Sequence, residues 1–176
     1  LMIPNLAMSY EAAKYEIIKK ISDKVEIRQY QKLTLATISA NKQKSQNDNF
    51  RELFQYISGN NKESKKIKMT IPVFQENLAD IKRMSFVIPS KYNQEQIPQP
   101  INKNIKIRFL KNAKFIAIVF SGRSTDKKFA KYQKILKKII SENNIKADLT
   151  NPINGYYNSP WTIAFFKRNE VLFRIK

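Results

Sequence analysis

Apolar and polar residues alternate strictly in four segments of the chain, which is the pattern of a β-strand with one buried face. The expected inward residues are Ile67, Met69, Ile71 and Val73; Met84, Phe86 and Ile88; Ile105, Ile107 and Phe109; and Val171, Phe173 and Ile175. A further strand is predicted over residues 25–30. Residues 33–40, 115–120 and 161–166 are apolar on both sides, so these segments are expected to cross the middle of the sheet or to line a cavity.

Two other segments have the spacing of amphipathic helices. The first covers about residues 48–57, and Gly59 follows it where a left-handed helix cap is common. The second covers about residues 126–142, with lysines on its polar face. The apolar faces consist of Phe50, Leu53, Phe54 and Ile57 in the first helix, and of Phe129, Tyr132, Leu136, Ile139 and Ile140 in the second.

The order of elements repeats along the chain. A strand pair, a helix and a second strand pair fill residues 15–90, and the same order fills residues 105–176, with 91–104 as the connecting loop. This repetition predicts two halves related by a pseudo-twofold axis within one α+β domain, residues 15–176. Residues 1–14 are expected to form a leader or a disordered segment.

The balance of charge favours anionic partners but does not identify one. The 176 residues include 33 basic and 14 acidic side chains, a formal charge of +19. Such a field attracts nucleic acid or anionic lipid. The lysines are scattered over every segment without a recognised nucleic-acid motif, and a Lys-, Asn- and Ile-rich composition produces the same charge without a partner. Nucleic-acid binding is therefore the less favoured interpretation.

The residue inventory argues against catalysis. The chain has no histidine and no cysteine, so the commonest general base, the thiolate nucleophile and the preferred zinc ligands are missing. The three glycines lie far apart and form no phosphate-binding loop. We expect neither an enzyme nor a structural metal site.

Nothing in the sequence fixes the compartment. No apolar run approaches the roughly 20 residues of a transmembrane helix. The first nine residues are compatible with the remnant of an export signal and with an ordinary leader. Periplasmic and cytoplasmic locations both remain open.

Several short motifs occur in the order found in one protein family. They are Val25-Glu26-Ile27-Arg28-Gln29-Tyr30, the segment Tyr56-Ile57-Ser58-Gly59-Asn60-Asn61, Met69-Thr70-Ile71-Pro72-Val73, Met84-Ser85-Phe86-Val87-Ile88-Pro89, Phe120-Ser121-Gly122 and Arg168-Asn169-Glu170-Val171. In this joint order the chain resembles the SOUL haem-binding protein family from about Tyr15 to Lys176.

The resemblance implies both a fold and a function. The fold is an antiparallel, distorted β-barrel of two similar halves, each with a helix against the sheet, as in bacterial effector-binding domains. The function is non-catalytic binding of haem or a related tetrapyrrole in an apolar groove without a histidine axial ligand. The residues that match the family's groove are Phe50, Leu53 and Phe54 on the first helix, and Trp161, Ile163 and Phe165 before the Arg168-Asn169-Glu170 motif.

The chain departs from the family where basic residues are expected, because Asn47, Gln55 and Ile163 occupy those positions. Arg51, Lys62 and Lys167 are the candidates to replace them at the rim. Two other functions therefore stay open. One is an effector-sensing or protein-interaction module of the same fold that does not bind haem, and the other is electrostatic binding to nucleic acid or anionic lipid.

Overall fold

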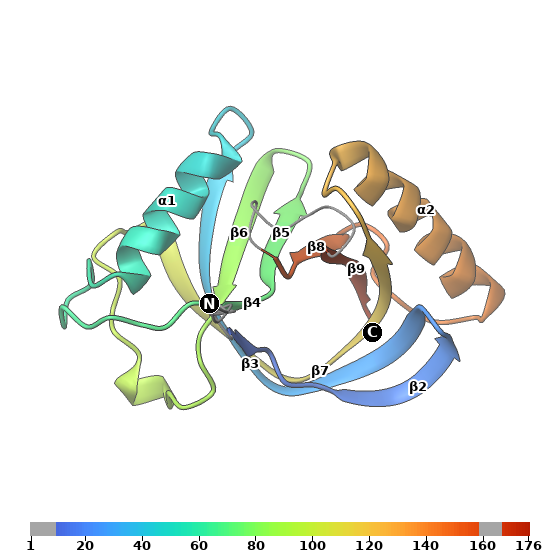
Figure 1. Ribbon diagram of the computed structural model, residues 1–176, viewed down its shortest axis with the longest axis horizontal. Helices are drawn as coiled ribbons and strands as arrows, with labels where there is room; N and C mark the ends of the chain where they lie inside the picture. Colours follow the sequence, from blue (N-terminus) through green and yellow to red (C-terminus); the bar gives the residue numbers. More distant parts are fainter. Residues whose placement is uncertain (1–9, 159–166) are drawn as a thin grey trace, which may run out of the picture.

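The computed structural model describes residues 10–158 and 167–176 (Figure 1). The elements in chain order are β1 Glu11–Ala12, β2 Glu16–Ser22, β3 Val25–Asn41, α1 Gln46–Ile57, β4 Thr70–Ile71, β5 Val73–Asn77, β6 Ile81–Val87, the 3₁₀ helix η1 Gln94–Gln96, β7 Ile105–Ser121, α2 Asp126–Glu142, β8 Ile153–Tyr156 and β9 Arg168–Arg174.

Six strands form a closed antiparallel barrel. The order is β3-β6-β5-β8-β9-β7, and β7 pairs back to β3 over most of its length. Strand β2 adds to β3 outside this ring. The helices α1 and α2 lie on two sides of the barrel (Figure 1). The predicted α+β barrel with one helix on each half is confirmed.

The pseudo-twofold relationship is visible in the two longest strands. Strands β3 and β7 have 17 residues each, and each leads into a helix. The segment Leu35–Asn41 of β3 pairs with β6, and the matching segment Phe115–Ser121 of β7 pairs with β9. Each long strand thus serves both halves of the barrel.

Apolar side chains form three cores, because the two faces of the barrel wall are both covered. One core lies between α1 and the sheet and includes Leu53 and Phe86. A second lies under α2 and includes Phe129 and Phe173. The third fills the barrel itself and includes Tyr30.

Several predicted strands need correction. Residues 66–69 form no strand, although Ile67 is buried in the α1 core, where its N–H donates to the carbonyl of Ile57 at 2.8 Å. The observed strands start only at Thr70 and Val73, on either side of Pro72, which cannot donate to a ladder. The pairs predicted at 25–30 with 33–40 and at 105–109 with 115–120 are each one continuous strand.

Other elements were missed or lie elsewhere. Strand β8 was not predicted, and the strand predicted at 161–166 lies outside the described residues. Strand β1 pairs with β4, which brings residues 11–12 of the predicted leader into contact with the domain. The helices agree with prediction, except that α1 begins two residues earlier, at Gln46.

Candidate functional site

Helix α1 presents two large aromatic side chains on its outer face. Phe50 is 40% exposed and Phe54 is 49% exposed. Their ring centroids lie 6.1 Å apart and their planes differ by 12°. The ring of Phe50 also meets the ring of Phe86 on β6, edge to face, with centroids 5.2 Å apart. Phe50 and Phe54, which we call the aromatic pair, therefore form an exposed apolar surface anchored to the sheet.

The helix beneath the aromatic pair is firmly held. The Ser45 hydroxyl caps its first turn by accepting from the Asp48 N–H at 3.1 Å. Leu53 is fully buried and Ile57 is 4% exposed. The Tyr56 hydroxyl donates to the carbonyl of Pro98 at 2.7 Å. Because the inner face is fixed in this way, the exposure of the aromatic pair belongs to the folded helix and is not a result of fraying.

Charged groups flank the aromatic pair on the same helix. Arg51 has a 70% exposed side chain and donates to Asp48 Oδ1 at 2.7 Å. Glu52 pairs with Lys44 and accepts from Asn102 Nδ2 at 2.7 Å. Burial alone would raise the pKa of Glu52, but these hydrogen bonds outweigh it and lower that pKa. Glu52 is thus neutralised locally, while Arg51 keeps a solvent-exposed charge beside Phe50.

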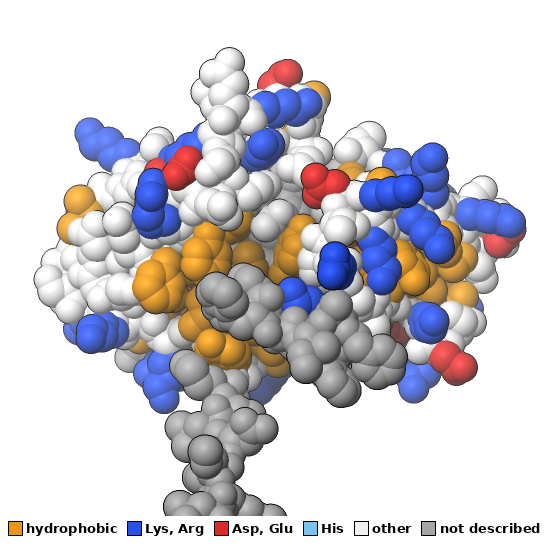
Figure 2. Space-filling model, turned by 45° about the horizontal axis from the view of Figure 1, so that its top comes forward, with side chains coloured by type: hydrophobic (Ala, Val, Ile, Leu, Met, Phe, Trp, Pro, Cys, Tyr) orange, Lys and Arg blue, Asp and Glu red, His pale blue; other side chains and the backbone are white. Residues whose placement is uncertain are grey.

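Figure 2 shows a face on which hydrophobic side chains gather near the middle, with lysine and arginine side chains around them. Apolar surface with a cationic rim suits a ligand that combines an apolar body with anionic groups.

The interior of the barrel holds a buried ion pair. The side chains of Arg28 and Glu170 are both fully buried, with Arg28 Nη1 2.7 Å from Glu170 Oε2. Arg28 Nε also donates to Glu26 Oε1 at 2.6 Å, and the Tyr157 hydroxyl donates to Glu170 Oε1 at 2.7 Å. The ring of Tyr15 covers Arg28, with Cζ 4.2 Å from the ring centroid. The hydrogen-bonding capacity of Glu170 is therefore used within the fold.

Two members of this network, Arg28 and Tyr157, keep their protons over the ordinary pH range. Burial by itself lowers the pKa of Arg28, but the charge of Glu170 outweighs it and raises that pKa. Burial, followed by the Glu170 charge, raises the pKa of Tyr157 well above its ordinary value. Arg28 stays charged and Tyr157 stays a neutral donor, so the network acts as structure and not as an acid–base pair.

The barrel interior, where the structure describes it, is largely filled by packed side chains. Its internal void, lined by Tyr30, Phe74 and Phe115 among others, measures about 30 Å³, close to the volume of one water molecule. This void is far too small for a porphyrin.

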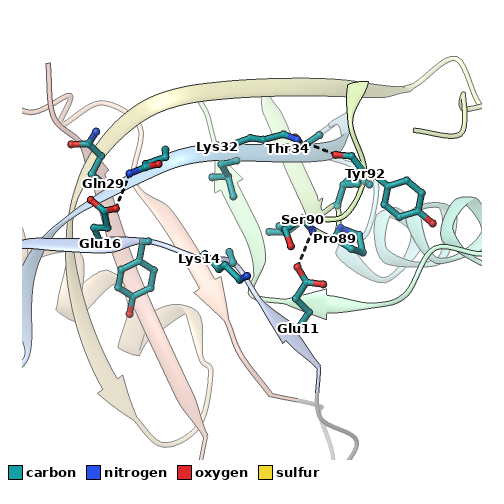
Figure 3. A pocket seen from close by; sticks show the side chains of 15 residues that line it. Glu11, Lys14, Glu16, Gln29, Lys32, Thr34, Pro89, Ser90 and Tyr92 are labelled. Carbon is teal, nitrogen blue, oxygen red and sulfur yellow. Dashed lines mark hydrogen bonds between the residues drawn. The ribbon is translucent and has the colours of Figure 1, made fainter. Parts of the chain in front are cut away.

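A larger pocket lies outside the wall, between residues 11–16, β3 and the segment after β6 (Figure 3). It measures about 340 Å³. Two hydrogen bonds cross it: Lys32 Nζ donates to the carbonyl of Tyr92 at 3.0 Å, and the Ser90 N–H donates to Glu11 Oε1 at 2.8 Å. Structural hydrogen bonds therefore tie the two sides of this pocket together.

Clusters of acidic side chains can hold metal ions. In the part of the chain that the structure describes, no three Asp or Glu side chains come close enough together to hold an ion.

The structure divides the predicted site residues that it describes into two groups. Phe50, Arg51 and Phe54 share the exposed side of α1, whereas Leu53 points into the α1 core and is fully buried. The predicted second wall, Trp161, Ile163 and Phe165, lies outside the described residues. Their roles in binding stay predictions.

Sequence reasoning missed the main partner of Glu170. Arg168 Nη2 of the same motif lies 3.8 Å from Glu170 Oε2, but the shorter contact, at 2.7 Å, comes from Arg28 on β3. The sequence offered one indication of this pair, since Arg28 and Glu170 each lie in one of the short family motifs. Only a contact across 142 positions of sequence joins them.

Comparison with solved structures places the barrel among known folds. Similar structures include the EcmrR C-terminal domain (TM-score 0.59, 11% identity, 87% of this chain and 97% of that one). A hydrolase from Listeria innocua is also similar (TM-score 0.57, 8% identity, 87% and 92%). A third is SAV2435 bound to tetraphenylphosphonium (TM-score 0.55, 10% identity, 87% and 94%). At these identities the likeness shows the fold alone.

Sequence comparison is more specific. No curated protein sequence matches the chain. Among the described residues, no helix is both long enough and apolar enough to cross a bilayer. The family model "SOUL heme-binding protein" matches residues 10–174. Because this match spans nearly the whole chain, the protein belongs to the SOUL haem-binding family.

Proposed function

We propose that this protein binds a tetrapyrrole, such as haem or a metal-free porphyrin, on the outer face of α1 without catalysing a reaction. The observation that carries the proposal is the aromatic pair, two nearly parallel phenylalanine rings left 40% and 49% exposed on a rigid helix. Family membership supports it, since the matching model is that of a haem-binding protein.

The chemistry of the surface fits such a ligand. A porphyrin offers two wide apolar faces, and aromatic side chains pack on such faces with about 0.5–1.5 kcal/mol beyond area burial. The porphyrin carboxylates require cations at the edge. Arg51 is suited to this because its present partner, Asp48, is also exposed and can be exchanged for a ligand carboxylate.

Recognition in this proposal depends on the porphyrin disc and its carboxylates. The sequence has no histidine or cysteine, so the two commonest protein ligands of haem iron are not supplied by this chain. Bound haem iron would supply its own redox chemistry, while the protein residues hold and orient the disc. Haem and metal-free protoporphyrin are then expected to bind with similar affinity.

The test is a titration of the purified protein with ferric haem and with metal-free protoporphyrin. Binding is followed by the Soret band and by quenching of Trp161, the single tryptophan. Saturable binding of both ligands that persists at high salt supports the proposal. Tetraphenylphosphonium serves as a third ligand, because SAV2435 is described as bound to it.

Each outcome has a clear meaning. Binding of haem alone would show that the iron is recognised and would contradict disc recognition. Binding of tetraphenylphosphonium alone would favour an effector-sensing module for apolar cations. Binding that disappears with salt would favour non-specific electrostatic attraction to the +19 surface.

A further inference from the structure

Strands β3 and β7 pair with each other along one edge. Along the opposite edge, the second half of each strand has a strand partner, but in the described part of the chain the first half has one only in β3. In β3, the second half pairs with β6 and the first half pairs with β2, from Glu16 opposite Gln29 to Ser22 opposite Val25. In β7, the second half pairs with β9. Among the described residues, no strand pairs with the matching first half, Ile105–Phe109. The two halves of the pseudo-twofold architecture therefore differ at one strand position, which β2 occupies beside β3 and which has no strand beside β7 among the described residues.

The backbone groups on this open edge are accessible to a partner. The Ile88 N–H donates to the carbonyl of Thr34 at 2.9 Å, so the backbone of Thr34 points toward β6 and away from β7. Phe109 is the register partner of Thr34. Thr34 and Phe109 therefore form a non-hydrogen-bonded pair of the antiparallel ladder, in which the backbone N–H and C=O groups of both residues point away from the partner strand. The N–H and C=O of Phe109 thus point outward from the edge of the sheet. Because the direction of the backbone N–H and C=O groups alternates from one residue to the next, those of Ile107 point the same way as those of Phe109.

A groove runs along this edge. It measures about 450 Å³ and lies between β7 and the loop that contains η1. Apolar side chains from both walls line it, among them Ile97, Pro100, Ile107 and Phe109. Phe109 is 42% exposed. The Ile105 N–H is taken by the carbonyl of Asn102 at 3.0 Å. At Ile107 and Phe109, the edge combines outward backbone groups with an apolar wall, the two features used when a peptide adds to a sheet.

The charges of the groove select the kind of partner. Lys103 and Lys106 line it, and no acidic residue does. A second copy of the chain is disfavoured, because antiparallel self-pairing centred on Ile107 would place Lys106 opposite Arg108 of the copy. Like charges directly opposite each other destabilise a strand pair. A segment with acidic residues on one side and apolar residues on the other is complementary.

We propose that Ile105–Phe109 and the η1 loop form a docking groove for an extended acidic peptide segment, which adds as an antiparallel strand in the position equivalent to β2. The partner's N–H and C=O groups bond to Ile107 and Phe109, its apolar side chains pack on the Phe109 side of the sheet, and its carboxylates meet Lys103 and Lys106. This site shares no residue with the aromatic pair and does not depend on tetrapyrrole binding.

The probe is a seven-residue capped peptide of alternating glutamate and valine, labelled for fluorescence anisotropy. Its matched control has the same side chains and charge but a methyl group on every backbone nitrogen, which removes the donors of a β-ladder. We expect saturable binding of the probe and at least tenfold weaker binding of the control. Amide hydrogen exchange of Ile107 and Phe109 is expected to slow at least tenfold in the complex.

Variants separate the backbone from the side chains. Phe109→Pro removes an outward N–H that edge strands tolerate losing, whereas Phe109→Ala keeps it. The proline variant should lose binding and the alanine variant should only weaken it; if the proline variant does not fold, the methylated peptide makes the same comparison. Lys103→Glu should weaken binding of the probe at least threefold.

Three results would overturn the proposal. Equal binding of the probe and its methylated control would show attraction by charge alone. Unchanged exchange at Ile107 and Phe109 would place the peptide elsewhere. Protection of both amides without peptide, together with a dimer in sedimentation, would identify a second copy as the occupant.

Discussion

Gly155 of β8 lies directly opposite Glu170 of β9 in the barrel wall. A Cβ atom on Gly155 would come within 2.7 Å of Glu170 Cγ, closer than any ordinary contact. The buried carboxylate therefore occupies the space that a side chain at position 155 would fill. This close approach lets Glu170 reach Arg28 and Tyr157 in the barrel interior.

Gly155→Ala is expected to destabilise the protein, because the added methyl group must displace the Glu170 side chain. Overpacking of this kind costs about 1–3 kcal/mol. Urea denaturation followed by circular dichroism measures the change. Stability within about 0.5 kcal/mol of the parent protein, the range of surface substitutions, would show that the contact relaxes freely.

Glu170→Gln is expected to be more damaging. The substitution leaves the Arg28 charge buried without its main partner, and breaking one side of a buried pair costs about 3–5 kcal/mol. Glu142→Gln is the control, since Glu142 and Lys138 form an exposed pair 3.6 Å apart, worth about 0–1 kcal/mol. Equal effects in the two variants would contradict a structural role for the buried pair.

Phe54→Ala is expected to weaken porphyrin binding about tenfold, which corresponds to about 1.4 kcal/mol of lost stacking and burial. Folding should change little because the Phe54 side chain is 49% exposed. Soret titration gives the affinity, and thermal denaturation confirms the fold. Leu149→Ala is the matched control, since Leu149 is exposed and follows α2. A similar loss in both variants would argue against the α1 site.

Glu11 provides a pH test of the N-terminal contact. The Ser90 N–H donates to its carboxylate and lowers the pKa of Glu11 from the ordinary 4.5. A carboxyl group whose pKa is lower in the folded state stabilises the fold at pH values above its unfolded-state pKa. That stabilisation is lost as the pH falls through its folded-state pKa. The parent protein should therefore exceed Glu11→Gln in stability at pH 6, and the difference should shrink below pH 4.5.

Thermal denaturation of both proteins between pH 6 and pH 3 measures this difference. A gap that stays constant over the range would show that the Ser90 contact does not depend on the charge of Glu11.

Local patterns were enough to predict most element types. The helical spacing of Phe129, Leu136 and Ile140 predicted α2 at its observed bounds, and alternation predicted β6 and β9. Alternation failed at residues 66–69, where Ile67 is buried against α1 without strand pairing. Periodicity reports which residues face inward, and it does not report whether a neighbouring strand is present to complete the ladder.

The sequence by itself determined the family, the two-half barrel and the helix that carries the aromatic pair, because motif order and periodicity are properties of the chain. Tertiary structure decided which apolar residues of that helix are available. Leu53 and Phe54 are neighbours in sequence, yet only the face of α1 turned to the sheet is covered, so Leu53 is fully buried and Phe54 is 49% exposed. The Arg28–Glu170 pair and the open edge at Ile105–Phe109 were also decided in three dimensions, because both depend on pairings between distant strands.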